Sequence, residues 1–321
     1  MTRARFVAVV RLPLDLFLAG IVLLVALPLW WLPWTLSCAL GRVYGYAFAW
    51  SWPLARRVAT INIARAYGDR LSPRERRRLF WAGFASMGQS VAEGLQFARR
   101  FKGRKSAPAA LCEIEDPALL HRLASGGPVV FVTAHLGSWE VAAGVASILS
   151  RHRGAIIVRS IDNVFLNAAV TRIRFDGTTQ WIEKRGAVLA ALARLRAGDS
   201  VGMLLDEDGG PNGIPVEFFG RPASTRQLAA SLSCRSGRSI AAAVCVRRPG
   251  GKFLFRLAVV EPPRDPVSHD DAVAAMTQEI ASIFERWIRD DPGQWRWMHW
   301  RWKHRPDGSR ETYSRRDVRA C

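Results

Sequence analysis

The chain has 321 residues, 49% apolar and 10% aromatic, which excludes wholesale disorder and suffices for one large domain. Its 46 basic and 27 acidic residues give a net charge of +19, which indicates a phosphate-bearing or acidic partner such as nucleic acid, an anionic membrane or an acidic protein. Five Cys residues without a CxxC pair exclude a zinc ribbon and a dense disulfide framework, and suit reduced thiols in the cytosol.

The first predicted element is an N-terminal membrane anchor. Residues 16–36 carry no charged side chain and are long enough to cross a hydrocarbon core. Trp30, Trp31 and Trp34 are typical of a membrane interface. A signal peptide fits less well because the run is long and lacks a small-residue cleavage site. The run is also compatible with a buried core helix and, because of its prolines, with a shallow or re-entrant anchor.

A second apolar stretch, 43–55, is short enough to lie on the membrane or dip into it. Three Arg residues precede the first run and three follow it, so the positive-inside rule does not fix the orientation. We expect residues 1–55 to form a hydrophobic anchor, with the α/β domain of residues 56–321 on the cytoplasmic side. A single-pass topology with an exported domain is the alternative.

The next segments predict helices and then an α/β fold. Residues 56–100 have helical apolar spacing, with Ser72 as an N-cap and Pro73 at the first helical position. From residue 128 short apolar runs alternate with helical stretches, which predicts a mainly parallel sheet flanked by helices. The expected strands are 128–135, 154–160, 200–207, 239–248 and 253–262. The expected helices are 139–150, 164–175, 186–196, 224–236 and 270–289. The domain divides into a helical lead-in at 56–115, a catalytic core at 116–262 and a C-terminal helix and Trp/Arg-rich tail at 263–321.

A candidate catalytic pair follows the first expected strand, in the sequence AHLGSWE. Parallel sheets place ligands at the carboxyl ends of their strands, so His135 stands where chemistry is expected. Gly137 permits a sharp turn and Ser138 can cap the following helix. We expect Glu140 to converge on His135 and fix its tautomer, leaving the other ring nitrogen as a general base. In the alternative interpretation, the His caps the turn and the Glu complements the helix dipole.

No motif for other chemistry accompanies this pair. The sequence lacks GxSxG, a P-loop and GxGxxG, so neither a covalent nucleophile nor a nucleotide cradle is indicated. Residues 206–208 are three adjacent acids, but neighbours on a strand end point in alternate directions and no His lies nearby in sequence. We therefore expect no metal at this site.

Three motifs, in this order, resemble the late acyltransferase (lauroyl/myristoyl) family of bacterial lipid A biosynthesis, within the lysophospholipid acyltransferase superfamily. They are AHLGSWE, LLDEDGGPNGIPVEFFGRPAST and QWRWMHWRWKHRP, and the resemblance runs from residue 56 to the tail. It implies that His135 and Glu140 form the catalytic pair. The substrate-binding residues that it implies are Arg172, Arg174, Asp206 and Arg221.

The resemblance also implies the reaction and its setting. A fatty acyl group would pass from an acyl thioester, acyl carrier protein rather than acyl-CoA, to a hydroxyl of a lipid A precursor at the bacterial inner membrane. The implied partners are acyl carrier protein, anionic membrane lipids and the glycolipid acceptor, with no nucleic acid and no cofactor beyond the co-substrate. Glu207 stands where the family more often has Gln or His, so another phosphoglycolipid or a lysophospholipid is an alternative acceptor.

Two further interpretations stay open. A non-catalytic, basic, membrane-anchored binding protein would share the charge and the anchor but has no need for the His–Glu pair. In the tail, Trp295, Trp297, Trp300 and Trp302 alternate with cations. That pattern suits a lipid headgroup layer, stacking on bases, or packing against the core.

Overall fold

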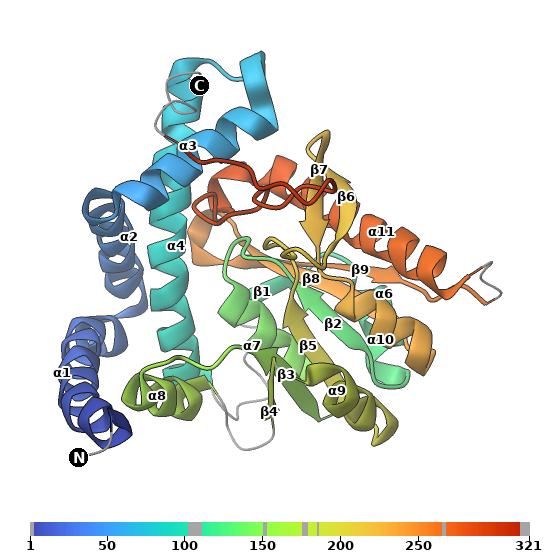
Figure 1. Ribbon diagram of the computed structural model, residues 1–321, viewed down its shortest axis with the longest axis horizontal. Coiled ribbons are helices and arrows are strands. Elements are labelled where there is room, and N and C mark those ends of the chain that lie inside the picture. Colours follow the sequence, from blue (N-terminus) through green and yellow to red (C-terminus); the bar gives the residue numbers. More distant parts are fainter. Residues whose placement is uncertain are drawn as a thin grey trace.

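The computed structural model describes residues 3–101, 111–149, 153–174, 179–184, 186–264 and 268–314, without the side chains of 3–11, 149 and 174. The N-terminal part is helical, and Figure 1 shows α1 and α2 at one side of the molecule beside α4. Its helices are α1 (Arg3–Trp31), α2 (Trp34–Ser51), α3 (Pro53–Tyr67) and α4 (Pro73–Phe101). Ser72 caps α4 as expected, because its hydroxyl accepts from the Glu75 amide while the Glu75 carboxylate accepts from the Ser72 amide.

A seven-stranded sheet forms the centre of the molecule, in the order β1-β9-β8-β2-β5-β3-β4. Neighbouring strands are parallel except β8 and β9, which are antiparallel. The strands are β1 (Cys112–Ile114), β2 (Val130–Thr133), β3 (Gly154–Val158), β4 (Thr179–Glu183), β5 (Ser200–Leu204), β8 (Ile240–Arg247) and β9 (Phe253–Val260). The predicted α/β architecture, a mainly parallel sheet flanked by helices, is confirmed.

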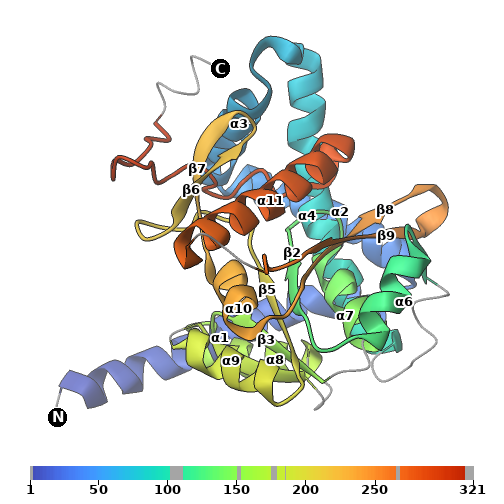
Figure 2. The same cartoon turned by 90° about the vertical axis from the view of Figure 1, so that its right-hand side faces the viewer.

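Helices cover both faces of this sheet, as Figure 2 shows. One layer contains α9, α10 and α11, in which α10 contacts both of the others, and the other layer contains α4 and α7 with α6 and α8. The bounds are α6 (Pro117–Ser125), α7 (Trp139–Leu149), α8 (Val164–Arg174), α9 (Ala187–Arg196), α10 (Leu228–Ser236) and α11 (His269–Asp290).

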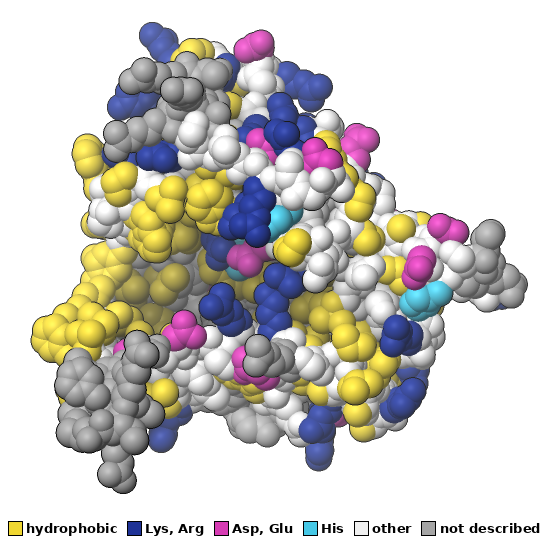
Figure 3. Space-filling model, in the orientation of Figure 1, with side chains coloured by type: hydrophobic (Ala, Val, Ile, Leu, Met, Phe, Trp, Pro, Cys, Tyr) yellow, Lys and Arg dark blue, Asp and Glu magenta, His cyan; other side chains and the backbone are white. Residues whose placement is uncertain are grey.

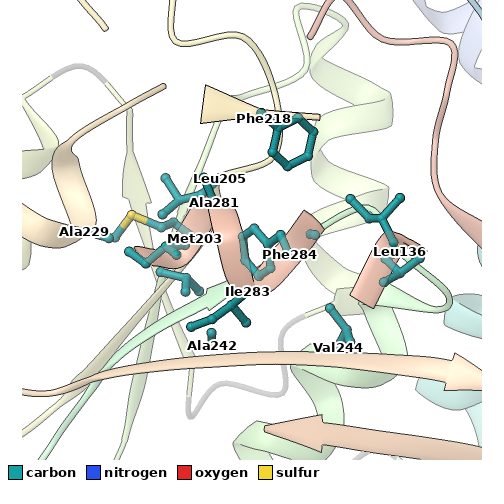
Figure 4. Close-up of a cluster of buried hydrophobic side chains, with 14 of the residues drawn as sticks. Leu136, Met203, Leu205, Phe218, Ala229, Ala242, Val244, Ala281, Ile283 and Phe284 are labelled. Carbon is teal, nitrogen blue, oxygen red and sulfur yellow. The ribbon is translucent and has the colours of Figure 1, made fainter. Parts of the chain in front are cut away.

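Strand β8 illustrates why the central strands have continuous apolar sequences. Ala242 and Val244 lie in one core cluster together with Phe284 of α11, and Figure 4 shows these side chains gathered there. Ala243 and Cys245, on the opposite face, belong to the cluster that includes residues of α7. Successive strand side chains point to opposite faces, so a strand covered on both faces needs apolar residues throughout.

Helix α1 presents a mostly exposed apolar surface. Its segment Leu12–Trp31 is the one described helix long and apolar enough to cross a membrane, and only 11% of its most apolar window is buried. Its end is tied to α4, because the Gln96 side-chain amide donates to the carbonyls of Leu29, Trp30 and Leu32.

Helix α2 belongs to the body of the protein. Gly41 and Gly45 of α2 face Gly88 of α4 so closely that a Cβ added at Gly45 would lie 2.1 Å from a backbone oxygen of α4. The stretch 43–55, expected to lie on or dip into the membrane, forms the end of α2 and the start of α3. This backbone contact places α2, part of the expected anchor, against the lead-in helix of the catalytic domain.

The structure also contains strands that the periodicity did not indicate. β1 and β4 lie at the two edges of the sheet, and β6 (Ile214–Phe218) and β7 (Arg221–Thr225) form a separate antiparallel hairpin. The helix expected over 224–236 therefore begins at Leu228. Short edge strands and hairpins are half-covered and lack the continuous apolar runs of the central strands.

Candidate active site

The turn after β2 carries His135 and is held by the backbone of two distant segments. The Ser138 amide donates to the Cys245 carbonyl at 2.8 Å, and the Arg296 amide donates to the His135 carbonyl at 3.1 Å. Gly137 has φ +64, and a Cβ there would lie 2.1 Å from the Cys245 oxygen, so the turn requires glycine. The Ser138 hydroxyl is buried without a hydrogen-bond partner within the described residues, so the expected side-chain cap is not formed.

Asp206, at the end of β5, holds His135 through both of its carboxylate oxygens. His135 Nδ1 lies 2.8 Å from Asp206 Oδ1, and the His135 amide donates to Oδ2 at 2.9 Å. Strands β2 and β5 are adjacent and parallel, and their last residues, Thr133 and Leu204, are paired. His135 and Asp206, which follow these strands, therefore lie at the same edge of the sheet. Within the described part of the chain no hydrogen bond reaches the opposite ring nitrogen, Nε2.

The charge of Asp206 fixes the tautomer of this histidine. Burial alone would raise the pKa of the Asp206 carboxyl, but the charge and hydrogen bond of His135, with His299 and Trp295, hold that pKa well below its usual range. The carboxylate is thus ionised and only accepts hydrogen bonds. Nδ1 of His135 must therefore carry a hydrogen, so in the neutral form of the ring the lone pair lies on Nε2.

Two residues of the C-terminal tail complete this arrangement. Trp295 Nε1 donates to Asp206 Oδ2 at 2.8 Å, and His299 Nε2 donates to the Asp206 carbonyl oxygen at 2.8 Å. Burial, followed by the charge of Arg296, lowers the pKa of His299, so its ring is neutral. The sequence singled out the tail as a motif, but nothing in it indicated that the indole and the imidazole would meet Asp206.

Glu140 lies in the first turn of α7 and packs over Gly94 of α4, where an added Cβ would be 2.8 Å from the Glu140 Cβ. The structure gives His135 its side-chain hydrogen bond to Asp206, and none to Glu140 within the described residues. The contact expected of Glu140 at the imidazole is therefore made by Asp206. Asp206, predicted to bind substrate, is buried, and its two carboxylate oxygens accept hydrogen bonds from His135 and Trp295. Its predicted role in binding substrate stays a prediction.

An apolar cavity of about 410 Å³ lies beside this pair, between α4, α7, α8 and the strands β2, β3 and β5. We call it the apolar cavity; its lining includes Phe131, Trp139, Glu140, Ile156, Val170 and Met203. The ring of Trp139 contacts that of His135, with centroids 5.1 Å apart. The cavity therefore reaches the neighbourhood of the imidazole and carries the Glu140 carboxyl in its wall.

The structure describes the side chains of two of the three predicted arginine ligands. Arg172 is exposed on α8, the helix that contributes Val170 and Ile173 to the apolar cavity. The side chain of Arg174 lies outside the described residues. Arg221 is exposed on the β6–β7 hairpin, where its Nε donates to the Arg65 carbonyl at 3.2 Å. Their predicted role in binding substrate stays a prediction.

The three acids at 206–208 diverge to three different partners. Asp206 contacts His135, Glu207 pairs with Arg296, and Asp208 pairs with His304. Alternate residues at a strand end point to different sides, which accounts for the divergence. Among the described residues, no group of three or more His, Cys, Asp or Glu is arranged to hold a metal ion.

The tail tryptophans pack internally. Trp295, Trp297 and Trp302 are at most 2% exposed and join the main core cluster, where they meet Phe218 and Phe219 of the hairpin. Of the three interpretations of the tail, packing against the core is the one seen for these side chains. Arg301 is buried with them and donates to the Ser224 carbonyl at 2.8 Å.

Comparison with known proteins identifies the family. The family model described as bacterial lipid A biosynthesis acyltransferase matches residues 8–304, nearly the whole chain. The chain belongs to this family. It is therefore an acyltransferase, and a non-catalytic binding protein is excluded.

Other comparisons add little to this assignment. A search of curated proteins gives no significant match. Among solved structures, the 1-acyl-sn-glycerophosphate acyltransferase PlsC from Thermotoga maritima is similar at 13% identity and a TM-score of 0.38, covering 82% of this chain and 99% of that one.

Proposed function

We propose that this acyltransferase moves a fatty acyl group from an acyl thioester to a hydroxyl of a lipid A precursor, with His135 as the general base. The observation that carries the proposal is the His135–Asp206 pair, whose geometry leaves Nε2 with a lone pair beside an apolar cavity. A lipid hydroxyl is a poor nucleophile, and a positioned imidazole removes its proton as the new bond forms.

The proposed step balances without a covalent enzyme intermediate. His135 Nε2 takes the hydroxyl proton while the oxygen attacks the thioester carbonyl. The C–O bond forms and the C–S bond breaks, and the imidazolium then gives its proton to the leaving thiolate. Asp206 stabilises the imidazolium through the Nδ1 hydrogen bond.

The apolar cavity supports a fatty acyl group as the part transferred. Its walls come mostly from aliphatic and aromatic side chains, and burying a methylene contributes roughly 0.8 kcal/mol. Glu140, in the same wall, is proposed to stabilise the imidazolium by its charge rather than by a hydrogen bond to Nδ1.

Charge and hydrophobic surface support the proposed partners. An acyl carrier protein is an acidic donor, and a net charge of +19 attracts it electrostatically. The exposed apolar face of α1 supports attachment to the bacterial inner membrane, with the catalytic domain on the cytoplasmic side where the thioester is made.

The test is acyl transfer by the purified, detergent-solubilised protein. Acyl carrier protein thioester or acyl-CoA is supplied as donor and a lipid A precursor as acceptor, and products are read by mass spectrometry. We expect one added acyl ester on the acceptor, with the carrier-protein donor preferred. An intact acceptor and thioester with both donors, or transfer only to lysophospholipids, would overturn the proposal.

A further inference from the structure

A second cavity, of about 470 Å³, lies on the tail side of His135 and has walls of two kinds. One wall is apolar and comes from α2, α3 and their junction, with Trp52, Leu54 and Val58. The other carries the charged and polar residues Glu207, Asp208, Arg296, His299 and Lys303. We call it the mixed cavity. Figure 3 shows basic, acidic and histidine side chains gathered around a hollow with hydrophobic side chains beside it.

The mixed cavity is adjacent to the proposed catalytic pair. Arg296, in its wall, donates its amide to the His135 carbonyl, and the His299 ring lies 6.4 Å from the His135 ring, centroid to centroid. The apolar cavity reaches the same histidine through Trp139. His135 therefore lies between the mostly apolar cavity and the mixed cavity.

The charged side chains in the wall of the mixed cavity differ in their hydrogen-bond partners. Arg296 pairs with Glu207, and Asp208 accepts from His304 and from the Gly210 amide. The Lys303 ammonium has no carboxylate partner in the described part of the chain and lies 5.5 Å from the centre of the Trp300 ring. An ammonium that is not bonded to a carboxylate of the protein can donate to an anionic group of a ligand.

A second polar group in this wall also lacks a partner. His299 is 5% exposed, and its Nδ1 is buried without a hydrogen bond among the described residues. Because Nε2 donates to the Asp206 carbonyl, Nδ1 has a lone pair that accepts. A buried acceptor without a donor is energetically costly.

The apolar wall continues onto the outer surface of the protein. Trp50, Trp52 and Leu54 around the α2–α3 junction are exposed, at 70%, 52% and 38%. Trp52 and Leu54 also line the cavity, so apolar surface continues from outside into it. An amphiphile can follow this surface with its chains while its head enters the charged end.

We propose that the mixed cavity binds the phosphorylated head of the lipid acceptor, with the phosphate on Lys303. This inference rests on the proposed acyl transfer. It adds the binding site of the acceptor and names the residue that binds the acceptor's phosphate. The thioester donor of a carrier protein or coenzyme A also carries phosphate, so the experiment must separate the two sources.

The test measures kinetics with Lys303→Gln, which shortens the side chain by one atom, keeps it polar and removes its charge. Lys252→Gln is the matched control, because Lys252 is exposed at the β8–β9 turn and lines neither cavity. The acceptor is used phosphorylated and after enzymatic removal of its phosphate. We expect Lys303→Gln to raise the acceptor KM about tenfold, with kcat and the donor KM unchanged. The dephosphorylated acceptor should not distinguish the variant from the wild type.

Three results would overturn the proposal: an unchanged acceptor KM, an equal rise with the dephosphorylated acceptor, or a rise in the donor KM. A binding measurement separates this failure from failure of the proposed reaction. Inert His135→Gln protein, with and without Lys303→Gln, is titrated with micelles containing phosphatidic acid or diacylglycerol. We expect Lys303 to strengthen binding to phosphatidic acid micelles alone; equal binding to both lipids would also overturn the proposal.

Discussion

The described residues include two His–Asp pairs of the same geometry. In each, one carboxylate accepts both the amide and the Nδ1 hydrogen of the histidine: Asp206 from His135, and Asp208 from His304. The pairs differ at the opposite ring nitrogen. Nε2 of His304 is buried with no partner among the described residues, whereas Nε2 of His135 is not enclosed in this way and its ring lies between two cavities. A His–Asp pair is therefore insufficient for catalysis; the space beside Nε2 is what distinguishes a base from a structural histidine.

The largest expected effect tests this distinction directly. His135→Gln should lower turnover by about 10²- to 10⁴-fold, because a general base contributes that much and glutamine cannot take a proton. His304→Gln should stay within a few-fold of the wild type. Single-turnover acyl transfer at saturating donor measures both, with thermal melts to show that each protein is folded. Comparable losses in the two variants would remove the distinction.

The next effect concerns the carboxylate. Oδ2 of Asp206 accepts two hydrogen bonds, from the His135 amide and the Trp295 indole, so Asp206→Asn must place its oxygen there. Its NH₂ group then faces Nδ1 and forces the hydrogen onto Nε2, the wrong tautomer for a base. We expect turnover to fall by about 10²-fold, with the acceptor KM little changed.

Asp208→Asn is the matched variant for this prediction, and it should leave kcat within about threefold. ¹⁵N spectra of the ring nitrogens of His135 report the tautomer independently of activity. An Asp206→Asn protein that keeps its hydrogen on Nδ1 would contradict the argument.

The comparison of the two histidines also shows which features of the site can be predicted from the sequence. The strand-end position of His135 follows from an apolar run and a glycine turn, both local features, and the parallel sheet follows from alternating segments. The identity of the carboxylate that contacts His135 cannot be predicted from local sequence. Asp206 is 71 residues away, and only the pairing of β2 with β5 brings it close. Glu140, five residues from His135, was the nearer candidate by sequence and lies in the cavity wall instead.

The tail marks a second limit of sequence reasoning. Its alternating Trp and cationic residues are compatible with lipid, nucleic acid or core packing, because all three offer apolar and anionic or aromatic surfaces. The choice depends on what the rest of the chain leaves uncovered. Here the β6–β7 hairpin and Asp206 present that surface to Trp295, Trp297 and Trp302, and no local pattern encodes this long-range fit.

A smaller effect is expected at Glu140. Glu140→Gln removes a carboxylate near His135 without changing the Asp206 hydrogen bond, so turnover should fall by roughly tenfold. A nearby anion favours the protonated imidazole, and its loss should move the acidic limb of the rate profile to lower pH. Rate profiles of the variant and the wild type measure this. An unmoved limb with near-normal turnover would leave Asp206 as the sole carboxylate acting on His135.

The smallest effect concerns stability in acid. The pKa of Asp206 is lower in the folded protein than the value of about 3.9 of an unperturbed aspartate, so its carboxylate stabilises the fold above that pH. This stabilisation is lost as the pH falls below about 3.9, since the unfolded chain binds the proton first. Asn cannot titrate, so the melting temperatures of wild type and Asp206→Asn should differ by several degrees at pH 7 and converge toward pH 3. Titrating groups that do not contact Asp206 are present in both proteins and cancel in the difference. Parallel curves down to pH 3 would mean that the folded protein does not favour the ionised form of Asp206, and the argument for the Nδ1–H tautomer of His135 would fail with it.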